Sequence, residues 1–217
     1  IGIGVQGLAD CFQILNMPYE SPDAGRLNKN IFETIYYAAL DESVELSKVD
    51  GPYQSFAGSP FSKGLTQMDL WGGTHTDERH PWSTLKQKLV QYGARNSLLT
   101  APMPTASTAS ILGNTESFEP RTSNLYTRRV LAGEYIIINK YLQQALIKRG
   151  IWSDNISSKL IQHRGSVQKI EEIPDDIRAT FKTVWEISQR KIIDMAADRG
   201  QYIDQSQSLN IHLPEPT

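Results

Sequence analysis

The strongest constraint on the fold is one long helical stretch with a defined start and a defined stop. Ser21-Pro22-Asp23 forms the start, because serine caps helices, proline suits the first helical position and an acid suits the first turn. Gly51-Pro52 ends the stretch. Between these signals, apolar residues recur at helical spacing: Leu27, Ile31, Ile35, Ala38, Leu46 and Val49. The sequence therefore predicts a long helix that begins at Ser21 and ends before Gly51.

Shorter helices and a long loop are predicted from the same kinds of signal. Residues 51–81 are rich in Gly, Ser, Thr and Pro, and they predict a long ordered loop. One helix is expected around Leu85 and Leu89, ending at Gly93, and another from Thr105 to Leu112, ending at Gly113. Further helices are expected at 140–149 and 155–162, and a single long one from Pro174 to Gly200. The last is the clearest pattern, with Ile177, Phe181, Val184, Trp185, Ser188, Ile192 and Met195 on one face.

Three segments read as strands. Residues 96–100 are mostly apolar, and 135–138 (Tyr-Ile-Ile-Ile) predict a buried strand. Leu209, Ile211 and Leu213 alternate with polar residues, which predicts a strand with one polar face. Because helices and strands alternate along the chain, the expected fold class is α/β.

Composition narrows the classes of function. The chain has 217 residues, enough for one ordinary domain, and its net charge of −2 argues against a nucleic-acid-binding surface. No apolar run approaches the roughly 20 residues that span a bilayer, so no membrane partner is expected. Cys11 is the single cysteine and cannot form an internal disulfide, which favours a reducing, cytoplasmic location. The chain opens inside an apolar run without Met, so we expect a fragment of a longer polypeptide.

The most informative motif is Pro104-Thr105-Ala106-Ser107-Thr108, which follows an apolar segment and opens a short helix. Backbone N–H groups at a helix start are free to bind an anion, and small side chains allow a phosphate to approach them. The hydroxyls of Thr105, Ser107 and Thr108 can add donors. The alternative is an ordinary capped turn, in which Thr105 or Ser107 serves only as the N-cap. On the residues alone, capped turns are the commoner arrangement.

Other candidate motifs have simpler structural explanations. Gly2-x-Gly4-x-x-Gly7 matches a dinucleotide fingerprint, but it lacks the flanking strands, so we interpret the glycines as permitting close packing. No metal site is expected at His75, Asp77, Glu78 and His80, because the segment is not helical and the spacing is wrong. Cys11 is expected to be a buried, inert thiol, and no catalytic residue is assigned.

Taken together, several stretches resemble the large subunit of eukaryotic-type class I ribonucleotide reductase. They are residues 2–10, 28–40, 51–53, 58–60, 95–108, 113–120, 123–130, 183–189 and 203–212. The resemblance implies that residues 1–217 are the C-terminal part of the catalytic barrel domain, a ten-stranded α/β barrel built from two half-barrels. It implies reduction of ribonucleoside diphosphates by a thiyl-radical mechanism. It also assigns Pro104, Thr105, Ala106, Ser107 and Thr108 to binding of the substrate phosphates.

The same resemblance says what this stretch does not supply. The family's radical cysteine, its reducing cysteines, its tyrosine pair and its effector sites lie in other parts of the polypeptide, and Tyr36-Tyr37 is interpreted as packing. The parent enzyme is expected to use ATP and dNTP effectors, a metal-radical cofactor in a small subunit, and thioredoxin or glutaredoxin as reductant. Expected partners are the small subunit and further large subunits. A non-catalytic interaction or regulatory domain that reuses the fold is the alternative.

Overall fold

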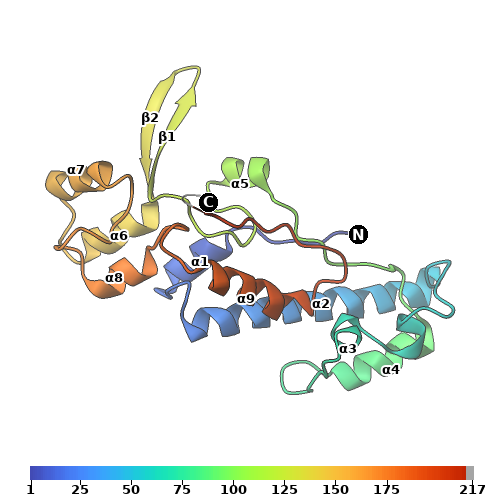
Figure 1. Ribbon diagram of the computed structural model, residues 1–217. Helices are drawn as coiled ribbons and strands as arrows, with labels where there is room; N and C mark the ends of the chain where they lie inside the picture. Colours follow the sequence, from blue (N-terminus) through green and yellow to red (C-terminus); the bar gives the residue numbers. More distant parts are fainter. Residues whose placement is uncertain (214–217) are drawn as a thin grey trace. The chain divides into compact units, whose positions relative to one another are not determined.

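The computed structural model describes residues 1–213, which form two compact units, each built from separate stretches of chain (Figure 1). Unit 1 comprises Ile1–Val5, Arg26–Pro104 and Asp194–Leu209, and unit 2 comprises Gln6–Gly25, Thr105–Ile193 and residues 210–213. None of the helices within residues 1–213 has the length and apolar character needed to cross a membrane.

The elements follow one another in a mostly helical order. They are α1 (Leu8–Ile14), α2 (Pro22–Asp50), the 3-10 helix η1 (Phe61–Lys63), α3 (Gln67–Leu70), α4 (Trp82–Tyr92), α5 (Ala106–Leu112), β1 (Leu125–Val130), β2 (Gly133–Ile138), α6 (Lys140–Lys148), α7 (Asp154–Gln162), α8 (Asp175–Thr180) and α9 (Gln189–Gly200). The predicted loop at 51–81 contains only η1 and α3.

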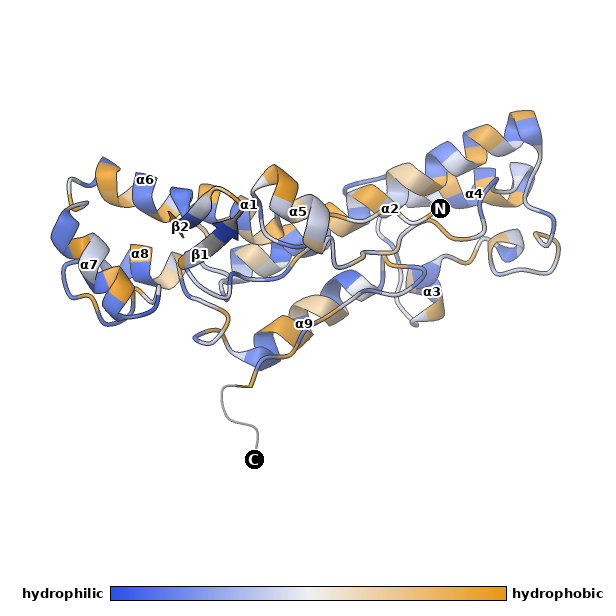
Figure 2. Cartoon of the chain, turned by 90° about the horizontal axis from the view of Figure 1, so that it is seen from above, coloured by the Kyte–Doolittle hydropathy of each residue, from blue (hydrophilic) through white to orange (hydrophobic). Residues whose placement is uncertain are grey.

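The long helix α2 has the predicted ends, but the buried face differs from the expected one. The Ser21 hydroxyl accepts a hydrogen bond from the Ala24 N–H at 3.1 Å, which confirms the N-cap. The buried apolar side chains recur every four residues: Phe32, Tyr36, Leu40 and Val44. Leu46 and Val49 are instead exposed, because α2 carries apolar residues on more than one side, as the alternating colours in Figure 2 show. The apolar periodicity therefore predicts where the helix lies but does not identify which of its sides is buried.

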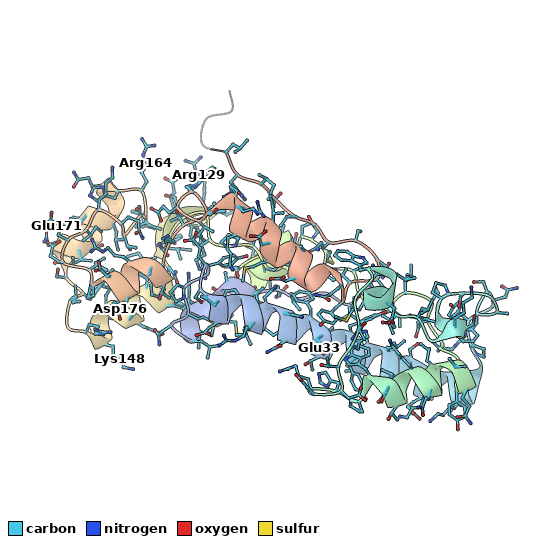
Figure 3. All side chains as sticks on the ribbon, turned by 60° about the horizontal axis from the view of Figure 1, so that its bottom comes forward. Glu33, Arg129, Lys148, Arg164, Glu171 and Asp176 are labelled. Carbon is cyan, nitrogen blue, oxygen red and sulfur yellow. The ribbon has the colours of Figure 1, made fainter. Side chains whose placement is uncertain are left out.

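The core of unit 1 joins α2 to α4. Trp82, Leu85 and Leu89 of α4 are buried, and the Trp82 ring lies 6.0 Å from that of Tyr36. The Trp82 indole N–H donates to the Glu33 carboxylate at 3.2 Å, and Figure 3 labels Glu33 on α2. Tyr36 is therefore a packing residue, as predicted. Gly93 follows α4 with a φ of 76°, which confirms the predicted stop.

The core of unit 2 lies among α6, α7 and α8. Its buried side chains are Leu142, Leu146, Ile156, Leu160, Val167, Ile170, Ile173, Ile177 and Phe181. Asn139 caps α6 by accepting from the Tyr141 N–H at 3.1 Å, and Ser153 caps α7 by accepting from the Ile156 N–H at 3.3 Å. Both helices lie where the sequence predicts them.

The buried strand predicted at 135–138 is a strand, but the prediction of burial is wrong. It forms β2, which pairs antiparallel with β1 from Leu125↔Ile138 to Val130↔Gly133. Tyr135 and Ile136 are exposed, and Figure 1 draws the hairpin projecting from the helices of its own unit. Figure 3 labels Arg129 on this hairpin, where it pairs with Glu134 at 2.9 Å in solvent. The apolar run thus predicted the strand correctly, but it did not predict whether the strand is buried.

The helix predicted from Pro174 to Gly200 is two helices, α8 and α9, separated by residues 181–188. Tertiary hydrogen bonds capture the backbone between them. The Asn124 amide donates to the Phe181 carbonyl at 2.7 Å, and the Val184 N–H donates to the Arg121 carbonyl at 2.8 Å. The Glu186 carboxylate accepts from the Thr183 N–H at 2.7 Å. These bonds replace the i to i−4 bonds of a continuous helix.

The two other predicted strands, at 96–100 and 209–213, form no ladder within residues 1–213, and Ser97 lies in a bend. Only a single parallel bridge forms, between Thr100 and Ile3. Thr100 is held by a side chain and by backbone: Asp204 accepts from the Thr100 N–H at 2.8 Å, and the Gln205 N–H donates to the Thr100 carbonyl at 3.2 Å. In unit 2, the Gln189 side chain accepts from the His212 N–H at 2.9 Å.

Candidate phosphate-binding site

The candidate site is the loop that leads into α5. Pro104 is exposed and ends the middle stretch of unit 1, whereas Thr105, Ala106, Ser107 and Thr108 belong to unit 2. Thr105 is the residue before the helix and has a left-handed backbone, with φ of 60° and ψ of 22°. Left-handed residues other than glycine are uncommon and often mark functional loops. The predicted start of the helix is confirmed.

The first backbone N–H groups of α5 are available. Among residues 1–213, the N–H groups of Ala106, Ser107 and Thr108 donate no hydrogen bond, and the first amide that does is that of Ala109, to the Thr105 carbonyl at 2.8 Å. All three residues are exposed. An oxyanion at this position can therefore accept several N–H bonds without displacing a protein carbonyl.

The three hydroxyls of the loop have different roles. Thr105 is only 8% exposed, and its hydroxyl oxygen accepts from the Ser117 N–H at 2.7 Å. The Thr108 hydroxyl bonds to the Gln6 side chain at 2.9 Å. Ser107 alone carries an exposed hydroxyl without a hydrogen bond to any residue that the structure describes. All three hydroxyls were predicted as possible donors to a ligand. In the structure Ser107 has the most accessible of the three, because those of Thr105 and Thr108 bond within the protein.

A hollow lies on the side of α5 within unit 2. Its volume is about 310 Å³, and its lining includes Ala106, Ser110, Asn114, Arg121 and His212. The Arg121 guanidinium is neutralised by the Asp10 carboxylate, with which it forms a short ion pair. An anion at the helix start would therefore meet backbone N–H dipoles rather than the charge of Arg121, and residues 104–108 contain no lysine or arginine.

The glycines of the dinucleotide-like motif have local structural roles. A Cβ on Gly4 would lie 3.0 Å from the Pro102 Cα, so this position requires close backbone approach. Gly7 has a φ of 81° and precedes α1. The close packing that we predicted is present, but at Gly4 it is the extended segment before α1 that approaches its neighbour.

The polar residues of the loop at 75–80 also act structurally. The His75 ring stacks on Trp82 with centroids 3.7 Å apart, and its Nε2 contacts the Thr66 hydroxyl at 2.8 Å. Asp77 accepts from the Ser83 N–H at 2.9 Å, at the start of α4. Within the part of the chain that the structure describes, no three His, Cys, Asp or Glu side chains are grouped to hold a metal ion.

Cys11, on α1, was predicted to be buried, and this is wrong: its exposure is intermediate. The error arose because the flanking residues Phe12 and Leu8 are buried, whereas position 11 lies at the edge of the same helix face.

Comparison with known proteins identifies the family. A model of the "ribonucleotide reductase, barrel domain" matches residues 1–217. The chain is 58% identical over 217 residues to the ribonucleoside-diphosphate reductase large subunit of Caenorhabditis elegans, covering 100% of this chain and 27% of that protein. It is 59% identical over 216 residues to that of Danio rerio, covering 100% of this chain and 27% of the relative.

A solved structure agrees with the sequence matches. The class Id ribonucleotide reductase alpha subunit of Actinobacillus ureae superposes with a TM-score of 0.73 at 31% identity, covering 99% of this chain and 34% of that one. This chain thus spans about a quarter of the length of the curated relatives it matches. Its mixture of helices with a β-hairpin is that of a segment of an α/β barrel. The chain belongs to the ribonucleotide reductase barrel-domain family.

Proposed function

We propose that this chain is the part of a ribonucleoside-diphosphate reductase large subunit that binds the diphosphate of the substrate. The observation that carries the proposal is the start of α5, where the N–H groups of Ala106, Ser107 and Thr108 are exposed and unbonded among the described residues. Relatives that match the whole chain are named ribonucleoside-diphosphate reductase large subunits, which supplies the reaction and the substrate class.

In this proposal the role of the chain is positional. The parent enzyme would use a cysteine thiyl radical to remove the 3′ hydrogen of the ribose, after which the 2′-hydroxyl leaves as water and a cysteine pair is oxidised. Cys11 is the only cysteine here, so this stretch contributes no such pair. Holding the diphosphate at a fixed place would orient the ribose toward the radical, and such orientation can account for several kcal/mol of a barrier. The lone cysteine also agrees with a cytoplasmic enzyme.

The proposal is tested by Ser107→Ala in the complete large subunit assayed with its small subunit. We expect KM for a ribonucleoside diphosphate to rise about tenfold with kcat little changed, because a hydroxyl bond to a charged phosphate contributes roughly 1.5 kcal/mol or more. Ser158→Ala is the matched control, since Ser158 is also an exposed helical serine but lies on α7, away from α5.

Thr105 is a poor position for this test. Its buried hydroxyl accepts the Ser117 N–H, and its substitution would disturb the loop itself. An unchanged KM in Ser107→Ala, together with a liganded crystal structure that places the phosphate oxygens away from the amides of Ala106 and Ser107, would remove the proposal.

A further inference from the structure

We propose that Asp10 is a positioning residue for the loop at 104–108, acting through residues 114–118. The proposal deepens the phosphate-binding function and rests on it for its effect on substrate binding. The conformational part stands separately, because every contact that carries it lies within unit 2.

Asp10 lies in the first turn of α1 and is 3% exposed. Its carboxylate has two partners from one neighbouring segment. It accepts the Thr115 N–H at 2.6 Å, and it forms the short ion pair with the Arg121 guanidinium. A buried carboxylate with two charge-assisted bonds is strongly oriented, and removing it leaves a buried N–H and a largely buried cation without their acceptor.

The start of α1 adds two backbone bonds to the same segment. The Gly7 N–H donates to the Thr115 carbonyl at 2.9 Å, and the Leu8 N–H donates to the Ser117 carbonyl at 3.2 Å. Thr115 is thus hydrogen-bonded on both sides of its backbone, through its N–H to Asp10 and through its carbonyl to Gly7. These bonds hold Ser117, which is 1% exposed, in a left-handed conformation with a φ of 42°.

Ser117 transmits the arrangement to the loop. Its N–H donates to the Thr105 hydroxyl at 2.7 Å, in a buried bond between two left-handed residues that are not glycine. Such a conformation is unfavourable for a residue with a side chain and persists only where surrounding contacts fix it. The conformation of Thr105 sets the direction of the first N–H groups of α5. Asp10 therefore orients the proposed phosphate donors without contacting a ligand.

The experiment compares Asp10→Ala and Asp10→Asn in the complete large subunit, assayed with the small subunit and CDP. Asparagine can still accept the Thr115 N–H but cannot neutralise Arg121. Glu20→Ala is the matched control, because the Glu20 carboxylate also bonds a backbone N–H, that of Ser188 at 3.0 Å, and a cation, Lys182 at 2.5 Å. No described contact links Glu20 to Thr105. Hydrogen exchange of the peptide spanning residues 103–112 reports the loop directly.

We expect Asp10→Ala to raise KM for CDP about tenfold, which corresponds to about 1.4 kcal/mol, with kcat nearly unchanged. Exchange at 103–112 should become faster, Asp10→Asn should lie between Asp10→Ala and the parent, and Glu20→Ala should change neither readout.

Unchanged exchange at 103–112 in both Asp10 variants overturns the positioning role. Faster exchange with an unchanged KM supports the positioning role and counts against phosphate binding by this loop, so the two failures are distinguishable. Should Asp10→Ala fail to fold, Asp10→Asn is compared with Glu20→Gln in its place. Exchange at 103–112 that is no faster than in Glu20→Gln overturns the positioning role, and KM then tests phosphate binding as before.

Discussion

The Thr105 hydroxyl bonds within the protein and so stabilises the loop, rather than being free to bind a ligand. Sequence reasoning counted its hydroxyl among the phosphate donors, since threonine at a helix start often presents one. In the structure that oxygen accepts the buried Ser117 N–H, at a left-handed position. Sequence reasoning also missed Asp10 and Ser117 as site residues. Their only signal was that residues 2–10 and 113–120 both belong to the stretches that resemble the family.

His75 is the clearest pH-sensitive residue. Its pKa is lowered to about 4, first by burial and then by the nearby charge of Lys86. The Thr66 hydroxyl donates to Asp69 at 2.7 Å, so His75 Nε2 must donate to Thr66. Protonation would then add a proton to Nδ1, which is buried and contacts no acceptor among residues 1–213.

This shift predicts loss of stability in mild acid. Because the folded pKa lies below the usual 6.5, the unfolded chain binds the proton first as pH falls, and unfolding becomes easier between about pH 6.5 and pH 4. Below that range both states are protonated and this contribution changes no further. Urea midpoints of the parent chain should therefore decline across the window more steeply than those of His75→Gln and His75→Phe. Equal slopes in all three proteins would contradict the assignment.

At the scale of elements, the ends of helices were predictable where a capping side chain or a glycine close in sequence determines them. Ser21 caps α2, and Gly93 and Gly113 follow α4 and α5 with positive φ, as their sequence positions suggest. The division of 174–200 into α8 and α9 was not predictable, because the bonds that divide it come from Asn124 and Arg121. On the face predicted for this segment, Ile177 and Phe181 before the break and Ile192 and Met195 after it are buried. Trp185 and Ser188, which lie within the break, are exposed.

Two glycines that follow helices make a matched pair of tests. Gly150 after α6 and Gly165 after α7 have φ of 69° and 84°. A Cβ on Gly150 would meet nothing within 4 Å, whereas on Gly165 it would lie 2.8 Å from the Leu125 backbone nitrogen. We expect Gly150→Ala to cost about 1 kcal/mol through backbone strain alone. Gly165→Ala should cost about 2–4 kcal/mol, because backbone must also move. Urea unfolding checks the difference, and equal costs would show that the contact at Gly165 relaxes freely.

At the scale of the whole molecule, the family relationship covers the entire chain, yet the chain is about a quarter of its curated relatives. The structure accordingly contains one hairpin and one isolated bridge among residues 1–213, rather than a barrel sheet. In the segment 209–213, the N–H groups of Asn210 and His212 donate to side chains, those of Glu119 and Gln189. The α/β class followed from the alternation of patterns, but strand ladders require neighbours, which no local pattern supplies.

The 217-residue chain by itself should show no ribonucleotide reduction. Its only cysteine is Cys11, and the proposed chemistry needs one cysteine for the radical and two more for the electrons. The measurement is deoxyribonucleotide formation from CDP in the presence of the small subunit and a dithiol reductant, with the complete large subunit as the positive control. Deoxyribonucleotide above the level of a chain-free blank would show that the chemistry does not depend on those further cysteines.

The sequence by itself determined the ends of α2, the position of α5, the small residues at 105–108 and the family. These depend on capping, on glycine stops and on residue identity, all of which act within a few positions. Tertiary structure alone decided which face of α2 is buried, where the last long helix breaks and which way Thr105 points. Each of these depends on a hydrogen bond or a packing contact with residues distant in sequence, so no local pattern contains it.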